Sequence, residues 1–236
     1  MNRSTFEPSI SIIIPVLNEA EYMAKVLLTI SKNSVSGQIH EILVVDGGST
    51  DTTPTIALAH GAKLIYGKKS RAAQMNLGAQ QATGTILYFL HVDSLPPKGF
   101  DRSILQAFKE EKMAGCFQMR FNSSSRFLKF FAWCTKINHE ICRGGDQSLF
   151  VDRKLFFNCG GFDETYTIYE DNEFIQRLYK RVPFTILPSK VTTSARRYEE
   201  KGIVRLQWHF GIIHLKHYLG ARPNDLYHYY KKHIMV

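Results

Sequence analysis

The segment "HVDS", residues 91–94, places an aspartate at the end of an apolar run. The preceding "ILYFL" is typical of a strand buried on both faces, where a lone carboxylate would be costly. We therefore expect Asp93 to lie just past the strand's carboxyl end, in a crevice and with a partner. A divalent cation, Mg²⁺ or Mn²⁺, is the natural partner, because hard cations take carboxylate oxygens together with the oxygens of a ligand's diphosphate. A turn or helix-cap role is the alternative.

A second pair of carboxylates lies in "YEDNEF", where Glu170 and Asp171 open a helical pattern. A carboxylate at the mouth of a helix is a candidate general base, because burial or a neighbouring like charge can raise the pKa of a carboxyl group. The alternative is that both residues only complement the positive end of the helix dipole.

Two further segments carry groups suited to a nucleotide. In "DGGSTDTT", Asp46 ends a strand and could accept from a nucleobase N–H or a ribose hydroxyl, and Gly47 opens a glycine pair that permits close backbone approach. A turn capped by Asp51 is the alternative. In "SARRY", Arg196 and Arg197 suit bidentate phosphate contacts, although a solvated basic face is the default expectation.

The elements that would position these residues alternate along the first half of the chain. Apolar runs within residues 10–14, 41–45, 63–67 and 85–94 are each followed by a helical pattern. Continuous apolar strands alternating with helices predict an α/β fold with a mostly parallel sheet flanked by helices. Such sheets bind ligands beyond the carboxyl ends of their strands, so Asp93 should have Glu19, Asp46 and Asp51 as neighbours.

The net charge bears on the kind of partner, and the cysteine content bears on the cellular compartment. The formal net charge of +9 favours an anionic partner, although a merely basic surface is equally consistent. The four cysteines form no zinc pattern, and we expect them to be reduced and mostly buried, as in a cytoplasmic protein. Neither a signal peptide nor an apolar run of about 18 residues is evident.

Two aromatic-rich basic stretches could either contact a membrane or pack within the protein. "RFLKFFAWCTKI" and "IVRLQWHFGIIHLKHYLG" could lie on the inner face of a membrane. The favoured alternative is that they form core helices or walls of an acceptor site. Neither stretch matches a nucleic-acid-binding module, so we expect no nucleic-acid partner.

The order of these motifs resembles one known family. From about Ser9 to about Arg181 the chain carries "SIIIPVLNEAEY", "EILVVDGGSTDTT", "SRAAQMNLGAQQATG", "ILYFLHVDS", "GGFDE" and "YEDNEFIQRL". This set is similar to the inverting family 2 glycosyltransferases of the GT-A fold. The tail "TSARRYEEKGIVRLQWHFGIIHLKHYLG" resembles a short bacterial subgroup, some members of which are found beside radical-enzyme genes.

The resemblance implies a nucleotide-diphospho-sugar donor, a divalent cation and direct displacement at the anomeric carbon. Asp93 corresponds to the last aspartate of the family's D-x-D metal motif, and Asp171, beside Glu170, to its catalytic base. The leaving diphosphate would be neutralised by the metal with Arg196 or Arg197. The positions expected to contact the nucleotide-sugar are Pro15, Glu19, Asp46, Gly47, Arg71, Asn76 and His91.

The resemblance also divides the expected single domain, residues 1–236, into three parts. Residues of about 9–115 would form the nucleotide-binding half, about 116–199 the acceptor and catalytic half, and about 200–236 a helical tail. We expect a UDP-sugar donor and a hydroxyl acceptor, and the aromatic residues between Phe127 and Trp133 favour a lipid-like one.

The chain departs from the family pattern at His91, which replaces the first aspartate of D-x-D. The Q-x-x-R-W motif of processive enzymes is missing, which argues against long polysaccharide synthesis. Two other functions stay open. A sugar nucleotidyltransferase would share this sheet but carry a glycine- and lysine/arginine-rich loop where this chain has "PVLNEAE". A non-catalytic nucleotide-sugar-binding module is the other.

Overall fold

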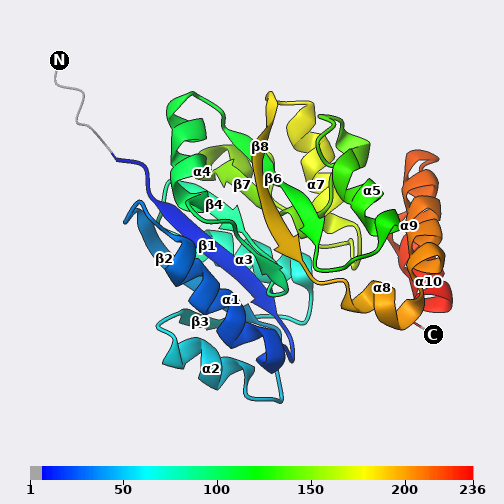
Figure 1. Cartoon of the computed structure of the whole chain (residues 1–236), viewed down its shortest axis with the longest axis horizontal. Helices are drawn as coiled ribbons and strands as arrows, with labels where there is room; N and C mark the ends of the chain where they lie inside the picture. The colour runs from blue at the N-terminus through cyan, green and yellow to red at the C-terminus, as the bar shows by residue number, and fades with distance from the viewer. Residues whose placement is uncertain (1–6, 236) are drawn as a thin grey trace.

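The computed structural model describes residues 7–235 and has a single curled sheet flanked by helices (Figure 1). Its strands are β1 (Ile10–Val16), β2 (Ile39–Asp46), β3 (Lys63–Tyr66), β4 (Ile86–Phe89), β5 (Ser94–Leu95), β6 (Ala114–Phe121), β7 (Leu149–Asp152) and β8 (Phe184–Thr193). Its helices are α1 (Ala20–Asn33), α2 (Thr53–Ala59), α3 (Arg71–Gln81), α4 (Phe100–Lys109), α5 (Arg126–Cys134), α6 (Arg153–Asn158), α7 (Glu170–Tyr179), α8 (Arg196–Lys201), α9 (Ile203–Tyr218) and α10 (Pro223–His233). Two 3₁₀ turns, η1 (Glu140–Cys142) and η2 (Gly145–Gln147), precede β7.

The sheet has the order β3-β2-β1-β4-β7-β6-β8-β5. The first four strands in this order are parallel, as the alternation of strands and helices predicts. β7 is antiparallel to both of its neighbours, while β6 and β8 run parallel to each other. The expected fold, a mostly parallel α/β sheet of the GT-A type, is therefore confirmed, with an antiparallel strand at its centre.

Both faces of the sheet are covered, which explains the unbroken apolar strands. Along β1, Ile12 and Ile14 pack with α1 and α4 on one face, while Ile13 packs with α3 and α7 on the other. Because each strand residue is buried whichever way it points, the strands need no alternation of polar and apolar residues. The carboxyl ends of the strands then offer the open edge of the sheet.

The loops after β1 and β2 are tied together at that edge. Asn18 accepts a hydrogen bond from the Thr50 backbone and its own N–H donates to the Ser49 hydroxyl. Asp51 accepts from the first backbone N–H groups of two helices, Ala20 of α1 and Thr53 of α2. Asp51 thus joins two helix starts, a wider role than the single cap that the sequence suggested.

The tail forms a third, smaller core at the far end of the molecule from β3. Helices α5, α8, α9 and α10 bury Leu128, Tyr198, Leu206, Ile213 and Leu226 together, and Figure 1 shows α9 and α10 at the edge of the fold. Within residues 7–235, no helix is long and apolar enough to cross a membrane.

All four cysteines are free, but the expectation that most are buried is wrong. Only Cys116, on β6, is buried; Cys134, Cys142 and Cys159 are half-buried because they lie on a helix or in turns beside cavities and loops rather than in the sheet.

Candidate active site

Two adjoining cavities, of about 400 and 310 Å³, lie beyond the carboxyl ends of the central strands. We call the larger the Asp171 cavity and the smaller the Asp93 cavity, after one carboxylate that lines that cavity and not the other. The residues that line both are Arg71, His91, Asp146, Arg197, Tyr198, Phe210 and Tyr230. Arginine and histidine side chains therefore stand between two compartments, each with its own carboxylate.

His91 lies at the junction and faces two carboxylates. Its Nε2 is 3.3 Å from Oδ2 of Asp171, at the start of α7, and its Nδ1 is 3.8 Å from Oδ1 of Asp146, in η2. Gly145 packs directly against this group: a Cβ there would be 2.1 Å from the Asp171 carboxylate and 2.6 Å from the His91 ring. Only a glycine leaves room for this arrangement.

The two carboxylates determine the charge of His91. Burial by itself would lower the pKa of His91, but the contacts with Asp146 and Asp171 raise it to about 10. Half of the Asp146 side chain is exposed, and its contact with His91 holds the pKa of Asp146 below the usual value. Near neutral pH, His91 is therefore a cation and Asp146 an anion.

Arg71 and Glu170 form an ion pair across the Asp171 cavity. Arg71 begins α3, and its Nη1 is 3.0 Å from Oε1 of Glu170, whose side chain is buried. Burial raises the pKa of Glu170, Arg71 lowers it, and the neighbouring Asp171 raises it again, so the net direction is upward. Oε2 of Glu170 has no hydrogen-bond partner among the described residues. A buried carboxylate oxygen without a partner is costly and is typical of a functional site.

On the other side, Glu19 and Arg196 connect the first loop to α8. Nη2 of Arg196 is 3.1 and 3.0 Å from the two carboxylate oxygens of Glu19, and its guanidinium lies 4.3 Å from the centroid of the Tyr22 ring. Burial raises the pKa of Glu19 in spite of Arg196. Pro15, Glu19 and Arg196, which the sequence assigned to a nucleotide-sugar, line the same cavity as Asp93, which it assigned to a metal ion.

Asp93 can hold a metal ion only with help from a ligand. Within residues 7–235, no three His, Cys, Asp or Glu side chains converge on one point. Burial raises the pKa of Asp93, and the Asp146 charge raises it further. Its carboxylate is half-buried, lines the cavity and takes no hydrogen bond from the described residues. This fits the magnesium-type arrangement in which one carboxylate shares the cation with substrate phosphates.

The helical tail completes the Asp171 cavity. Arg197 of α8 donates to the Tyr230 hydroxyl of α10, and Tyr169 is hydrogen bonded to Nδ1 of His214 in α9 at 2.7 Å. Burial lowers the pKa of His214 to about 4, so this ring is neutral. The remaining walls are largely apolar and include Phe121, Phe131, Ile141, Ile168, Phe210 and Ile213.

Three predicted nucleotide contacts line neither cavity. Asp46 is buried and accepts from the backbone of Gly48 and Ser49 in its own loop, while Gly47 packs against Gln74.

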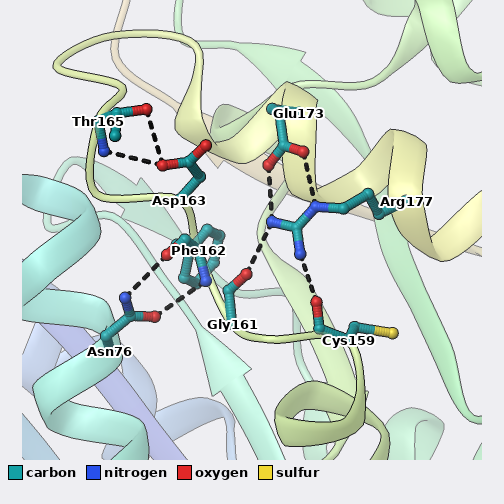
Figure 2. A network of polar contacts seen from close by, with 8 residues as sticks. All are labelled: Asn76, Cys159, Gly161, Phe162, Asp163, Thr165, Glu173 and Arg177. Atoms are coloured by element: carbon teal, nitrogen blue, oxygen red, sulfur yellow. Dashed lines mark hydrogen bonds and ion pairs between the residues drawn. The ribbon is translucent and has the colours of Figure 1, made fainter.

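Asn76, the third, holds the turn that the sequence "GGFDE" forms. Its amide accepts from the Phe162 N–H and donates to the Phe162 carbonyl, both at 2.9 Å. Arg177 binds the same turn from α7 through the Gly161 carbonyl at 2.7 Å, as Figure 2 shows. These contacts fix the loop that leads into Glu170 and Asp171.

Sequence reasoning missed Asp146 and the tyrosines of the tail. Asp146 belongs to "GGDQSLF", which looks like a plain turn, and the only sequence signal was its pair of glycines. Tyr198 and Tyr230 reach the cavities because α8 and α10 fold back over the sheet edge, which no local pattern predicts.

Comparison with known proteins identifies the family of this chain. The sequence profile described as "Glycosyl transferase family 2" matches residues 11–163. An uncharacterized glycosyltransferase of Mycobacterium tuberculosis is 26% identical, with 73% of this chain and 70% of that protein covered. The first curated relatives that match are longer, and the chain spans about a third of their length.

Solved structures share the fold. A mannosyltransferase from Pyrobaculum calidifontis, in complex with GDP-Man and Mn²⁺, superposes with a TM-score of 0.62 at 20% identity, covering 80% of this chain and 57% of that one. TarS residues 1–349 of S. aureus, in complex with UDP-GlcNAc, gives 0.65 at 20% identity, covering 79% and 58%. The fold is that of the GT-A glycosyltransferases. The chain belongs to glycosyltransferase family 2.

Proposed function

We propose that this glycosyltransferase moves a sugar from a nucleotide-diphospho-sugar, a UDP-sugar by preference, to a hydroxyl acceptor with inversion at the anomeric carbon. The observation that carries the proposal is the pair of adjoining cavities with His91 at their junction and Asp171 beside it in the larger one. The Asp93 cavity would hold the donor and the Asp171 cavity the acceptor. Asp171 would then face the anomeric carbon from the side opposite the leaving group.

Cationic side chains suit the departure of a diphosphate. Arg71, His91 and Arg197 line both cavities, and Arg196 lines the Asp93 cavity beside them. Negative charge grows on the leaving diphosphate as the sugar–oxygen bond breaks, and fixed cations in a water-poor site stabilise that charge. Pro15 and Glu19 lie where they could contact the base and ribose. We retain Asp46, Gly47 and Asn76 only as loop supports for that pocket.

Asp93 would hold a Mn²⁺ or Mg²⁺ ion jointly with the donor's phosphates. When bound, such an ion supplies positive charge to the leaving diphosphate. The raised pKa of Asp93 supports this assignment, because an anion that its surroundings destabilise gains from a nearby cation.

On the acceptor side, Asp171 would act as general base. It would take the proton of the attacking hydroxyl as the new bond to the anomeric carbon forms and the bond to the diphosphate breaks. His91, whose Nε2 is 3.3 Å from Oδ2 of Asp171, would orient the carboxylate for that transfer. Glu170 would assist by orienting Arg71 toward the diphosphate.

The solved relatives support the choice of ligands. The mannosyltransferase and TarS structures contain a GDP-sugar with Mn²⁺ and a UDP-sugar, respectively. Their sequence identity to this chain is too low to transfer a donor, so the preference for UDP stays part of the proposal.

Thermal unfolding with UDP, GDP, CDP, dTDP and ADP, each with and without Mn²⁺, tests the donor site. A ligand at about 100 times its Kd adds about 2.7 kcal/mol, which raises Tm by about 5–10 °C in a chain of this size. We expect the largest shift with UDP and Mn²⁺, and expect Asp93→Asn to abolish the part that needs the metal. A Tm shift that requires neither Mn²⁺ nor Asp93 would show that Asp93 is not the metal ligand. No shift with any diphosphate would overturn the proposed function.

A further inference from the structure

Helix α9 carries a stripe of apolar side chains on its solvent side. Val204, Trp208, Leu215 and Leu219 are 57–73% exposed and follow one another at intervals of four, seven and four residues, which places them on one face. The opposite face is used for packing, since Leu206 and Ile213 are buried in the tail core. The packing of α9 against the rest of the protein therefore does not use the exposed stripe.

Helix α5 and the turn that follows it also carry a stripe of exposed apolar side chains. Phe127, Phe130, Trp133 and Ile137 are 38–57% exposed and are spaced by three, three and four residues. Leu128 points the other way and is fully buried. Phe130 and Trp133 stack at 6.3 Å, so the aromatic rings form a continuous exposed patch. Helices α5 and α9 also contact each other.

The charges interleaved with these stripes have one sign. Residues 126–139 contain Arg126, Lys129 and Lys136, all exposed, and no aspartate or glutamate. Residues 203–222, which include α9, also contain basic residues and no acidic one. Exposed aromatic and aliphatic residues among lysines and arginines are typical of helices that lie in the headgroup region of an anionic bilayer.

Both helices also form walls of the Asp171 cavity. Phe131 and Cys134 of α5, and Phe210 and His214 of α9, line it from their inner sides. The exposed stripes therefore adjoin the compartment that holds the candidate base, and a surface bound to them would lie next to it.

We propose that the apolar stripes of α5 and α9 form a docking surface for an anionic lipid bilayer, with the surrounding lysines and arginines binding the headgroups. A second copy of the chain suits this surface poorly, because a twofold contact would bring the same basic residues together. This surface depends on the exposure and charge of α5 and α9 and is independent of the proposed reaction.

The chain's tryptophans provide the test. The sequence has two, Trp133 and Trp208, one in each stripe and both exposed. Titration with vesicles of phosphatidylcholine mixed with phosphatidylglycerol should shift the emission of the full chain to the blue, and phosphatidylcholine alone should have little effect. Trp133→Phe and Trp208→Phe each leave one reporter, and both should show the shift, because both helices enter the headgroup region.

Vesicle flotation of matched variants measures which residues carry the binding. Phe130→Ser and Leu215→Ser should each weaken partitioning about tenfold, as expected for one lost large apolar side chain. Lys129→Gln and Lys136→Gln should each weaken it about fivefold, since one basic residue near an anionic surface contributes about 1 kcal/mol. The controls are Leu58→Ser on α2 and Lys109→Gln on α4, both exposed and distant from the tail, and neither should change it.

Three outcomes would overturn the proposal. One is an unchanged tryptophan emission on addition of anionic vesicles. Another is vesicle binding that the two apolar substitutions weaken no more than the Leu58 control. The third is concentration-dependent dimerisation, seen by light scattering and abolished by the same substitutions, which would assign the stripes to a self-interface. The Tm of each variant, measured alongside, confirms that these exposed substitutions leave the fold intact.

Discussion

The substitution Gly145→Ala should disable the proposed base, Asp171, by displacing its carboxylate while leaving the carboxylate itself unaltered. The Cβ of Gly145→Ala would lie 2.1 Å from Oδ2 of Asp171, where real Cβ contacts stay beyond 3.0 Å. The carboxylate cannot simply rotate away, because the His91 ring lies on the same side at 2.6 Å from that Cβ. Both side chains are largely buried, so the whole group must move.

The distances set the size of the effect. Relieving the clash requires a displacement of about 1 Å, and a misplacement of that size at a reacting group costs about 100-fold in rate. A factor of 100 corresponds to about 2.7 kcal/mol of activation free energy. The donor's affinity should change much less, because Asp171 does not line the Asp93 cavity and His91 is only one of the four cationic side chains around it.

The neighbouring glycine provides the control. A Cβ at Gly144 would meet nothing within 4 Å, and its φ of −173° is extended backbone that alanine adopts freely. UDP release from a UDP-sugar, with water or an added alcohol as acceptor, gives kcat and KM for both variants. We expect Gly144→Ala to match the wild type and Gly145→Ala to lose kcat with a much smaller change in KM.

Wild-type turnover in Gly145→Ala would refute the reasoning, since the Asp171, His91 and Gly145 arrangement would then be irrelevant to the chemistry. Overpacking also costs stability, about 1–3 kcal/mol, so the assay should be run well below the variant's Tm. A loss of rate that tracks the fraction unfolded would contradict the prediction as well.

Further predictions concern three side chains. Asp171→Asn keeps the shape but cannot take a proton, so kcat should fall by 10²–10⁴ while UDP affinity by thermal shift is unchanged; unchanged kcat would exclude Asp171 as base. Burial raises the pKa of Glu170, so the folded state binds this proton more tightly than the unfolded state, and that contribution to stability is lost as pH rises through the folded pKa. Glu170→Gln should remove this slope from Tm measured across the acidic range; an unaltered slope would contradict it. Asn76→Ala loses both bonds to Phe162 and should lower stability by about 1–3 kcal/mol without weakening UDP binding; weaker UDP binding at unchanged Tm would return Asn76 to the nucleotide site.

The parallel half of the fold was predictable because its signals are local. Each strand is an apolar run, each helix follows at once, and right-handed crossovers leave few alternatives. The central position of β7 was not predictable. Leu149–Asp152 is short, and it lies between β4 and β6 because of pairings with strands more than 30 residues away in sequence.

The candidate site likewise contains residues that sequence order could place and residues that it could not. Asp93 and Glu19 follow strands and could be placed at the sheet edge from sequence order, and both line the Asp93 cavity. Asp146 could not, because it reaches His91 only through the path of η2, and the same sequence would suit an exposed turn. Asn76 shows the opposite case: sequence order placed it near the nucleotide, whereas its amide bonds the Phe162 backbone of a loop and lines neither cavity.

The most direct test of the central claim is the configuration of the sugar that leaves the donor. Proton NMR can follow an α-linked UDP-sugar in the presence of the protein and Mn²⁺, with water as acceptor if no other is known. Direct displacement predicts UDP and initially the β anomer, formed by the wild type and about 10²–10⁴ times more slowly by Asp171→Asn. Initial release of the α anomer, or equal rates in the two proteins, would contradict a direct displacement assisted by Asp171.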